Sequence, residues 1–317
     1  MALHPEAEAL LAAFASIPPI DYATITAPEF RQIFVPPPPA PVPLFEVDDR
    51  LLELAGRSVP VRIYRPSGER GLPVTAYFHG GGFVIGDLDM TDAICRTLAA
   101  ESGGLVVSVD YRLAPETPFP GGLDDCQAVV DWLSVDAESI GGDSRLLAVA
   151  GDSSGGNFAA VIAQECARSG VALAHQVLLY PVLDHDFTTP SYVACGEGFL
   201  LTTELMGWYF EQYLAAGGDG RDPRVSPLRA PRLAGVAPAS IHTAEFDPLR
   251  SEAESYAAAL AGSGVQVTQR DWPGQLHGFL LQLGSNGAAD EVLSDAGRAL
   301  RTAFARSASA PADELTA

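Results

Sequence analysis

The chain has 317 residues, 47% of them hydrophobic, so it can bury a large core, and its length suits one α/β domain with an appendage. Its 40 acidic and 19 basic residues give a net charge of -21, which repels phosphate backbones and anionic lipid headgroups. We therefore expect neither a nucleic-acid partner nor a membrane partner.

The residue types exclude several kinds of chemistry. All 19 basic residues are arginines, and without lysine the chain has no Schiff-base residue, pyridoxal phosphate anchor or P-loop lysine. The cysteines form no CxxC pair, so neither a zinc site nor a redox motif is indicated. We expect buried free thiols at Cys95, Cys126, Cys166 and Cys195.

The first twenty residues, MALHPEAEALLAAFASIPPI, do not resemble a secretory signal. They carry glutamates before the apolar residues and have no basic region. No apolar run reaches the roughly 18 residues that a membrane-spanning helix needs. We expect a cytoplasmic protein with reduced cysteines.

The segment FVPPPPAPVPL, residues 34–44, separates an N-terminal segment (1–45) from the rest. It is neither helix nor central strand, because proline fixes φ and lacks an N–H donor. Beyond it come β-rich runs at 59–66 and 74–78, then an alternation of apolar strands with helical stretches. That alternation predicts a parallel sheet with helices on both faces. The expected strands are LVVSVDY, LLAVAGD, HQVLLYPV, ASIHTAEF and VQVTQRDW.

The interval from Pro181 to Pro238 is too long for a single crossover connection. It contains GFLLTTELMGWYFEQYL, an amphipathic helix preceded by Thr-Thr-Glu. We predict that 186–235 is an insertion that packs with segment 1–45 as a lid, leaving 46–185 and 236–306 as the core. The final residues, 307–317, are predicted to be a disordered tail.

The stretch GDSSGG is compatible with two unrelated classes of serine enzyme. Chymotrypsin-like proteases have two β-barrels and the chain order His, Asp, Ser. Upstream of Ser153 the only histidines are His4, near the terminus, and His79, which three glycines follow. The parallel α/β pattern also disagrees with a protease, and we reject that interpretation.

The alternative is the nucleophile elbow G-x-S-x-G, a sharp turn between a strand and a helix. The strand LLAVA runs directly into GDSSG and then into the helical GNFAAVIAQECAR. The tight turn requires glycines two residues before and after the nucleophile. Gly151 and Gly155 satisfy this for Ser153, whereas Ser154 would have Asp152 at the first position. Ser153 is the predicted nucleophile.

An elbow enzyme places its acid and then its histidine after the serine. His175 opens a strand, His185 lies in a loop and His242 lies inside a strand. Only His277, in the loop after the last strand, follows a suitable acid. We predict that His277 is the general base.

The predicted acid is Asp247, at the end of the strand ASIHTAEF, although an aspartate there also serves as a helix N-cap. Asp184 and Asp186 are alternatives that follow a different strand, and Asp271 lies along the strand before His277. The Asp-His-Asp run at 184–186 also suggests a metal site, but we expect a solvated loop.

Attack on a carbonyl creates an oxyanion, which needs preset N–H donors. HGGGF, residues 79–83, follows the strand VTAYF, and its glycine amides can turn inward without Cβ clashes. A HGGG motif at this place is typical of the hydrolase oxyanion hole.

Together, HGGGFVIGDLD, DYRLAPETPFP, GDSSGGN, DPLR and HGF resemble the hormone-sensitive lipase family of α/β-hydrolases, the bacterial family IV carboxylesterases. The resemblance extends from about residue 51 to residue 304 and includes DPRVSPL at 222–228. It implies an eight-stranded, mostly parallel sheet with a helical cap built from the N-terminal segment and an insertion after the sixth strand.

Carried over position by position, the resemblance gives Ser153, Asp247 and His277 the roles of the triad. The amides of Gly81, Gly82 and Ser154 correspond to the oxyanion hole. The family usually has alanine after the nucleophile, where this chain has Ser154, but a backbone donor should survive that change. The resemblance also implies that Tyr111, Arg112 and Glu116 buttress the glycine loop.

We therefore predict a carboxylester hydrolase for short- to medium-chain acyl esters that works through an acyl-enzyme and needs neither cofactor nor metal. An amidase or acyltransferase would use the same residues. A non-catalytic ligand receptor on this fold would be expected to have lost a triad residue, and all three are present. By family analogy, a homodimer is compatible with this prediction.

Overall fold

The protein is described here by a computed structural model that covers residues 2–15, 18–33 and 42–309. Its centre is an eight-stranded sheet of order β1-β2-β4-β3-β5-β6-β7-β8. Strand β2 pairs antiparallel with both β1 and β4, and the other neighbours pair in parallel. The strands are β1 (Glu46–Leu54), β2 (Arg57–Arg65), β3 (Leu72–Phe78), β4 (Leu105–Val109), β5 (Gly142–Asp152), β6 (His175–Leu179), β7 (Ala239–Phe246) and β8 (Val267–Leu276).

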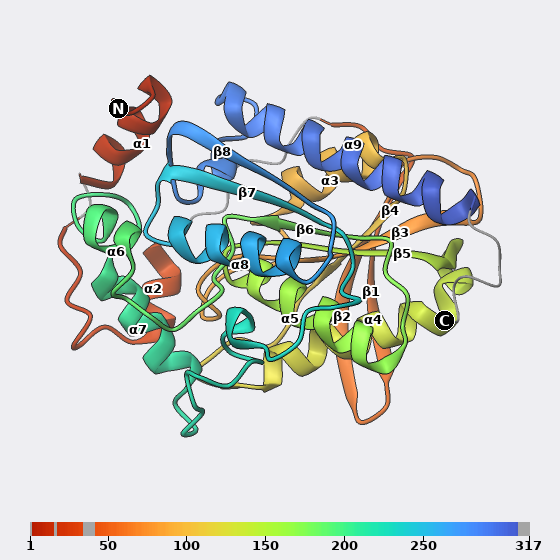
Figure 1. Cartoon of the computed structure of the whole chain (residues 1–317), viewed down its shortest axis with the longest axis horizontal. Helices are drawn as coiled ribbons and strands as arrows, with labels where there is room; N and C mark the ends of the chain where they lie inside the picture. The colour runs from red at the N-terminus through yellow and green to blue at the C-terminus, as the bar shows by residue number, and fades with distance from the viewer. Residues whose placement is uncertain (1, 16–17, 34–41, 310–317) are drawn as a thin grey trace.

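Helices cover both faces of the sheet (Figure 1). Helices α3 and α9 pack over one face and α4, α5 and α8 over the other, each layer with its own buried apolar cluster. The prediction of an eight-stranded, mostly parallel sheet between two helical layers is confirmed. These helices are α3 (Asp92–Ser102), α4 (Gly121–Asp136), α5 (Ser154–Ser169), α8 (Arg250–Gly262) and α9 (Gly287–Ser309).

The remaining helices of the described residues gather at one end of the sheet, on the left of Figure 1. The ring of Phe30 on α2 lies 4.8 Å from that of Trp208 on α7, which brings the N-terminal segment against the insertion after β6. We propose that segments 1–45 and 186–235 form one cap. The helices are α1 (Pro5–Ala15), α2 (Ala27–Ile33), α6 (Pro190–Cys195) and α7 (Thr203–Tyr213); short 3₁₀ turns lie at Ala137–Ile140, Pro227–Arg229 and Phe279–Gln282.

Helix α7 begins where the Thr-Thr-Glu signal predicts a start. The Thr202 hydroxyl caps the helix by accepting a hydrogen bond from the Leu205 amide at 3.1 Å. A side-chain acceptor at this position satisfies one of the amides that a helix leaves free in its first turn. The helix then buries its aromatic residues toward the core and the N-terminal segment.

The structure adds one strand and corrects one boundary. Strand β1 was not expected, because EVDDRLLEL is mostly polar; it is stabilised as an edge strand by pairing with β2. Helix α9 continues to Ser309, so residues 307–309 are helical, contrary to the predicted tail. The rest of that tail, 310–317, and residues 34–41 of the proline-rich segment lie outside the described residues.

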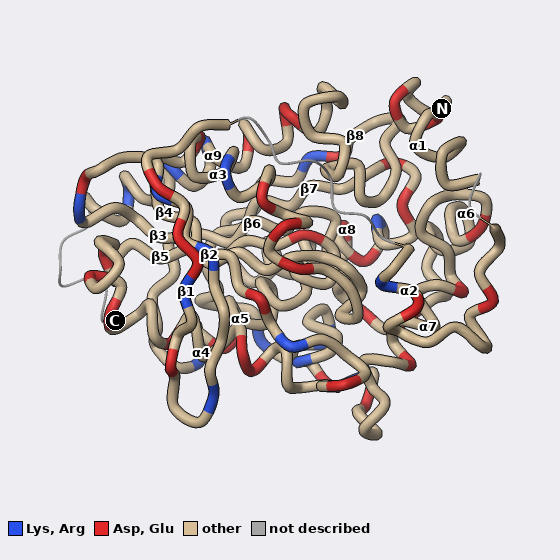
Figure 2. Tube along the Cα trace, turned by 180° about the vertical axis from the view of Figure 1, so that it is seen from behind, with Lys and Arg blue, Asp and Glu red and all other residues tan. Residues whose placement is uncertain are grey.

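Acidic residues are spread along the described trace, with fewer arginines among them (Figure 2). All four cysteines are free and buried, as predicted. Within the described ranges, no helix combines the length and the apolar character needed to cross a membrane.

Candidate active site

The Ser153 turn joins β5 directly to α5, and its backbone is unusual. Ser153 has φ 54° and ψ -119°, a conformation that costs free energy for a residue with a side chain. The chain packs too tightly around it for side chains at the flanking glycines. A Cβ on Gly151 would lie 2.3 Å from the Gly155 carbonyl oxygen, and one on Gly155 would lie 2.0 Å from that of Phe78. Close backbone contacts therefore explain why the elbow requires glycines two residues before and two residues after Ser153.

Three side chains from the carboxyl ends of β5, β7 and β8 meet at this turn. His277 Nε2 lies 3.0 Å from Ser153 Oγ, and His277 Nδ1 lies 2.7 Å from Asp247 Oδ2. A carboxylate only accepts hydrogen bonds, so Nδ1 carries the proton and Nε2 is left to accept from the serine hydroxyl. Asp247 is 1% exposed, whereas Ser153 and His277 are 8% and 9% exposed and border a pocket.

Asp247 combines the two roles that its sequence position suggests. Its Oδ2 faces His277, while its Oδ1 accepts a hydrogen bond from the Leu249 amide at 2.8 Å, just before α8. The alternative acids are engaged elsewhere. Asp184 pairs with Arg229, and Asp271 accepts a hydrogen bond from Thr243; Asp186 accepts from Thr188.

The other strand histidines are held in the core. The His242 Nδ1 accepts a hydrogen bond from the Trp272 indole at 3.2 Å, and His175 Nε2 lies 2.8 Å from the Ser240 hydroxyl. Burial lowers the pKa of each histidine to about 4, so both are neutral near neutral pH. Neither ring lines the pocket beside Ser153.

The glycine loop after β3 forms one wall of that pocket. Gly82 has φ +59°, and a Cβ there would lie 2.3 Å from the Tyr209 ring of the cap helix α7. No described residue accepts a hydrogen bond from the amides of Gly81 and Gly82. The Ser154 amide is likewise free of a helical partner, because it belongs to the first residue of α5. These amides stay available to an incoming anion.

Asp152 is a site residue that sequence reasoning missed. Its Oδ1 accepts hydrogen bonds from the Tyr77 hydroxyl at 2.7 Å and from the Gly80 amide at 2.9 Å, so it ties the serine turn to the glycine loop. Burial raises the pKa of this carboxyl. The available signal was its position directly before Ser153, at the end of a central strand.

The DYRLAPE residues contact three different parts of the molecule: the glycine loop, helix α4 and the cap. The Tyr111 hydroxyl donates to the His79 carbonyl at 2.7 Å, and the two rings stack. Arg112 instead pairs with Asp125. Glu116 pairs with Arg31 of α2, which also donates to the carbonyl of Val84 beyond the glycine loop.

The pocket over Ser153 has a volume of about 280 Å³ and is lined mainly by apolar side chains. Tyr180, another residue that sequence reasoning missed, presents its ring to His277 edge-on at 4.8 Å from the end of β6. The N-terminal segment contributes Phe14, Ile20, Tyr22, Phe30 and Ile33; the insertion contributes Leu201, Leu205, Met206 and Tyr209; and the core contributes Ile85, Met90 and Leu281.

No group of His, Cys, Asp and Glu side chains within the described residues is arranged to hold a metal ion. The Asp184–Asp186 loop in particular uses its carboxylates in hydrogen bonds and an ion pair with neighbouring side chains.

The combination of this sheet and this elbow defines an α/β-hydrolase, and comparison with known proteins agrees. A family model described as the α/β-hydrolase fold matches residues 75–281. The chain belongs to this family, and its members of the hormone-sensitive lipase type are the ones that the motifs resemble.

Several named relatives are esterases. The chain is 43% identical over 267 residues to the carboxylic ester hydrolase LipN of Mycobacterium tuberculosis, covering 80% of this chain and 71% of LipN. It is 40% identical over 243 residues to an ethyl acetate hydrolase of Pseudomonas putida, covering 75% and 76%. The crystal structure of a thermostable esterase from Pseudomonas putida ECU1011 matches with a TM-score of 0.89 at 33% identity, covering 96% and 98%.

Proposed function

We propose that this protein is a serine carboxylesterase that hydrolyses short- to medium-chain acyl esters through an acyl-enzyme. The observation that carries the proposal is the hydrogen-bonded series Ser153, His277, Asp247, which opens into an apolar pocket of about 280 Å³. The ester hydrolases among its relatives support the reaction class.

In the acylation half, Ser153 Oγ attacks the ester carbonyl while His277 Nε2 takes the hydroxyl proton. Asp247 holds the imidazole in the required tautomer and stabilises the imidazolium that forms. The amides of Gly81, Gly82 and Ser154 donate to the oxyanion. When the tetrahedral intermediate collapses, His277 returns the proton to the leaving alcohol oxygen, and the acyl group remains on Ser153.

Deacylation repeats these steps with water. His277 removes a proton from the water, whose oxygen attacks the acyl carbonyl, and the same proton then restores the Ser153 hydroxyl as the acid leaves. The reaction consumes one water and needs neither metal nor cofactor. The apolar lining favours esters without charge near the carbonyl, because an unpaired charge loses its hydration in such a pocket.

The substitutions Ser153→Ala and Ser154→Ala test the choice of serine. We expect Ser153→Ala to lower kcat/KM for p-nitrophenyl butyrate by about 10⁴-fold or more. Ser154→Ala should retain most activity because its proposed role uses only the backbone amide. Equal losses in the two variants would contradict the assignment.

Acyl transfer is the alternative that the same residues allow. An added alcohol that competes with water for the acyl-enzyme would appear as a new ester product, and the ratio of ester to acid measures the extent of acyl transfer. We propose hydrolysis as the main outcome.

We also propose, from the sequence, a cytoplasmic location. Family analogy suggests a homodimer, which size-exclusion chromatography with light scattering would test.

A further inference from the structure

Met90 is a pocket residue held by a loop outside the cap. The loop 86–91 connects the glycine loop to α3, and the Met90 side chain is buried against the pocket that Ser153 also lines. Within the loop, Asp87 Oδ1 accepts hydrogen bonds from the amides of Asp89 and Met90 at 3.0 Å and 2.8 Å. These two bonds order the backbone at Met90 within the loop. They do not connect the loop to the sheet.

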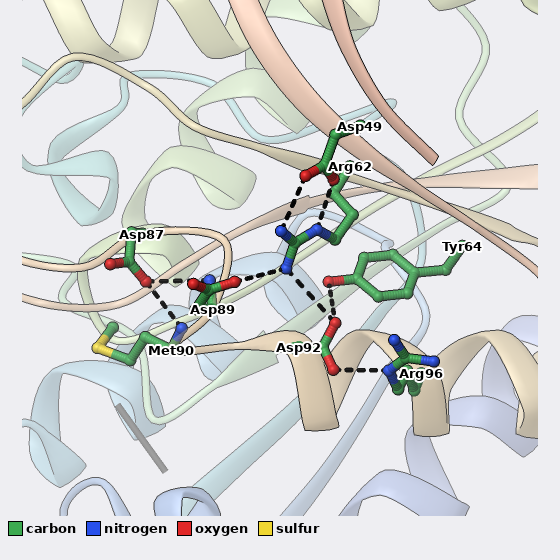
Figure 3. A network of polar contacts seen from close by, with 8 residues as sticks. All are labelled: Asp49, Arg62, Tyr64, Asp87, Asp89, Met90, Asp92 and Arg96. Carbon is green, nitrogen blue, oxygen red and sulfur yellow. Dashed lines mark hydrogen bonds and ion pairs between the residues drawn. The ribbon is translucent and has the colours of Figure 1, made fainter. Parts of the chain in front are cut away.

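Arg62 on β2 supplies those contacts (Figure 3). Its guanidinium makes two hydrogen bonds to Asp49 on β1, at 2.6 Å and 3.0 Å, and a third to Asp89 of the loop at 2.7 Å. The same Nη1 lies 3.6 Å from Asp92, the first residue of α3. One side chain thus joins the β1–β2 hairpin, the loop and the start of α3.

The charges around Arg62 make it hard to replace. Asp92 is also held by the Tyr64 hydroxyl at 3.1 Å and by Arg96 at 2.6 Å, so it stays fixed without Arg62. Asp49 and Asp89 have no such second cation in the network that Figure 3 draws. Without the guanidinium, Asp49 and Asp89 would lose the cation that they share, and because both carboxylates are largely exposed, their mutual repulsion would be screened by water.

We propose that Arg62 is a positioning residue for the substrate pocket: it anchors loop 86–91 so that Met90 forms a fixed wall, and this wall limits which ester chain lengths fit. The inference rests on the proposed function. Arg62 touches no reacting atom and acts only through the loop. Its loss should change selectivity between esters more than it changes the chemical step.

The test compares kcat/KM for p-nitrophenyl octanoate and butyrate, and for octyl and butyl acetate, in Arg62→Gln and wild type. We expect the ratio of kcat/KM for the long ester to that for the short ester to rise about fourfold, either in the acyl series or in the alcohol series. A fourfold change corresponds to the free energy of burying about one more methylene. Arg50→Gln is the matched control, because Arg50 lies on β1 and, among the described residues, pairs only with Asp48, two residues away. It should leave both ratios unchanged.

Two further variants keep the test informative if Arg62→Gln folds poorly. Asp89→Asn removes one contact at an exposed carboxylate and should shift the same ratio in the same direction. Met90→Ala should shift it too, and the double variant Arg62→Gln/Met90→Ala should show less than the sum of the two effects. Fully additive effects, or unchanged ratios in both series, would overturn the proposal.

Binding of p-nitrophenyl alkyl ethers separates this inference from the proposed function, since these ligands lack the carbonyl. Their Kd values report the pocket wall even if Ser153 is not the nucleophile. A long-to-short Kd ratio that changes with Arg62→Gln supports the anchored wall, whatever the reaction. Failure of the proposed function would instead show as full activity in Ser153→Ala.

Discussion

The contacts within the carboxyl edge of the sheet differ in kind from the contacts within the cap that faces it. At the edge, Ser153, Asp247 and His277 each follow a strand and are joined by hydrogen bonds of 2.7 Å and 3.0 Å. In the cap, Phe30 and Tyr209 meet through ring contacts at 5.9 Å without a directional bond. Hydrogen bonds at the edge constrain both the distance and the direction between donor and acceptor, whereas ring packing in the cap mainly fills volume.

This difference separates two kinds of sensitivity. Hydrogen bonds between groups on a rigid sheet fail when one partner is removed, because the other is left unsatisfied. Apolar packing tolerates exchanges of similar volume. We therefore expect substitutions at the edge to affect kcat for every ester, and substitutions in the cap to affect which ester is preferred.

The largest expected effect comes from breaking the edge. His277→Ala and Asp247→Asn should each lower kcat by about 10³-fold or more, because the first removes the proposed base and the second favours the wrong imidazole tautomer. The measurement is kcat for p-nitrophenyl butyrate in each variant. Asp184→Asn is the control, since Asp184 pairs with Arg229 outside the pocket. Loss in that variant with activity retained in Asp247→Asn would reassign the acid.

A smaller effect on kcat/KM should follow the length of the acyl chain of the ester. It tests the cap, whose side chains line the pocket. Each methylene that enters the apolar pocket is worth roughly 0.8 kcal/mol, so kcat/KM should climb over the first acyl carbons. The pocket is finite, at about 280 Å³, so the trend should reverse. We place the reversal at about four to eight carbons, from the family resemblance.

The measurement is kcat/KM for p-nitrophenyl esters from acetate to palmitate, below and above their critical micelle concentrations. The net charge of -21 disfavours adsorption to anionic interfaces, so no jump in rate is expected when an interface forms. A profile that still rises at palmitate would indicate a lipase with an open acyl channel.

The three side chains that meet at the edge could be located from the sequence because their signals are local. The strand, glycines and helix around Ser153 occupy one continuous stretch, and His277 and Asp247 each directly follow a strand. The parallel sheet then brings their ends together without further information.

The contacts that sequence reasoning missed join distant parts of the chain. Asp152 reaches Gly80 across 72 positions, and Arg62 reaches Asp89 across 27. The Tyr209 ring covers Gly82 from the cap. Nothing in the residue types around either partner indicates such a pairing, because an aspartate or an aromatic residue has many acceptable neighbours. Strand β1 was missed for a related reason: its stability comes from pairing with β2 and not from an apolar pattern.

The smallest expected effect concerns pH and the core beneath the edge. His277 borders the pocket, whereas His175 and His242 lie in neighbouring strands with pKa values that burial lowers to about 4. In the unfolded chain a histidine has a pKa of about 6.5. Between about pH 6.5 and pH 4, these histidines are protonated in the unfolded chain but remain neutral in the folded protein. Their contribution to the free energy of unfolding is therefore complete above about pH 6.5 and is lost as the pH falls toward 4.

We therefore expect the Tm of the wild type to fall by a few degrees between about pH 7 and about pH 5, with up to about 2 kcal/mol of stability lost per buried histidine. Buried Glu252 acts in the opposite direction, because burial raises its pKa and its protonation favours the fold. A substitution therefore isolates the histidine contribution. In His242→Gln, whose amide oxygen can still accept from Trp272, the fall should be smaller than in the wild type. Equal slopes for wild type and His242→Gln, measured by thermal melts across this range, would show that His242 does not supply the acid sensitivity of the core.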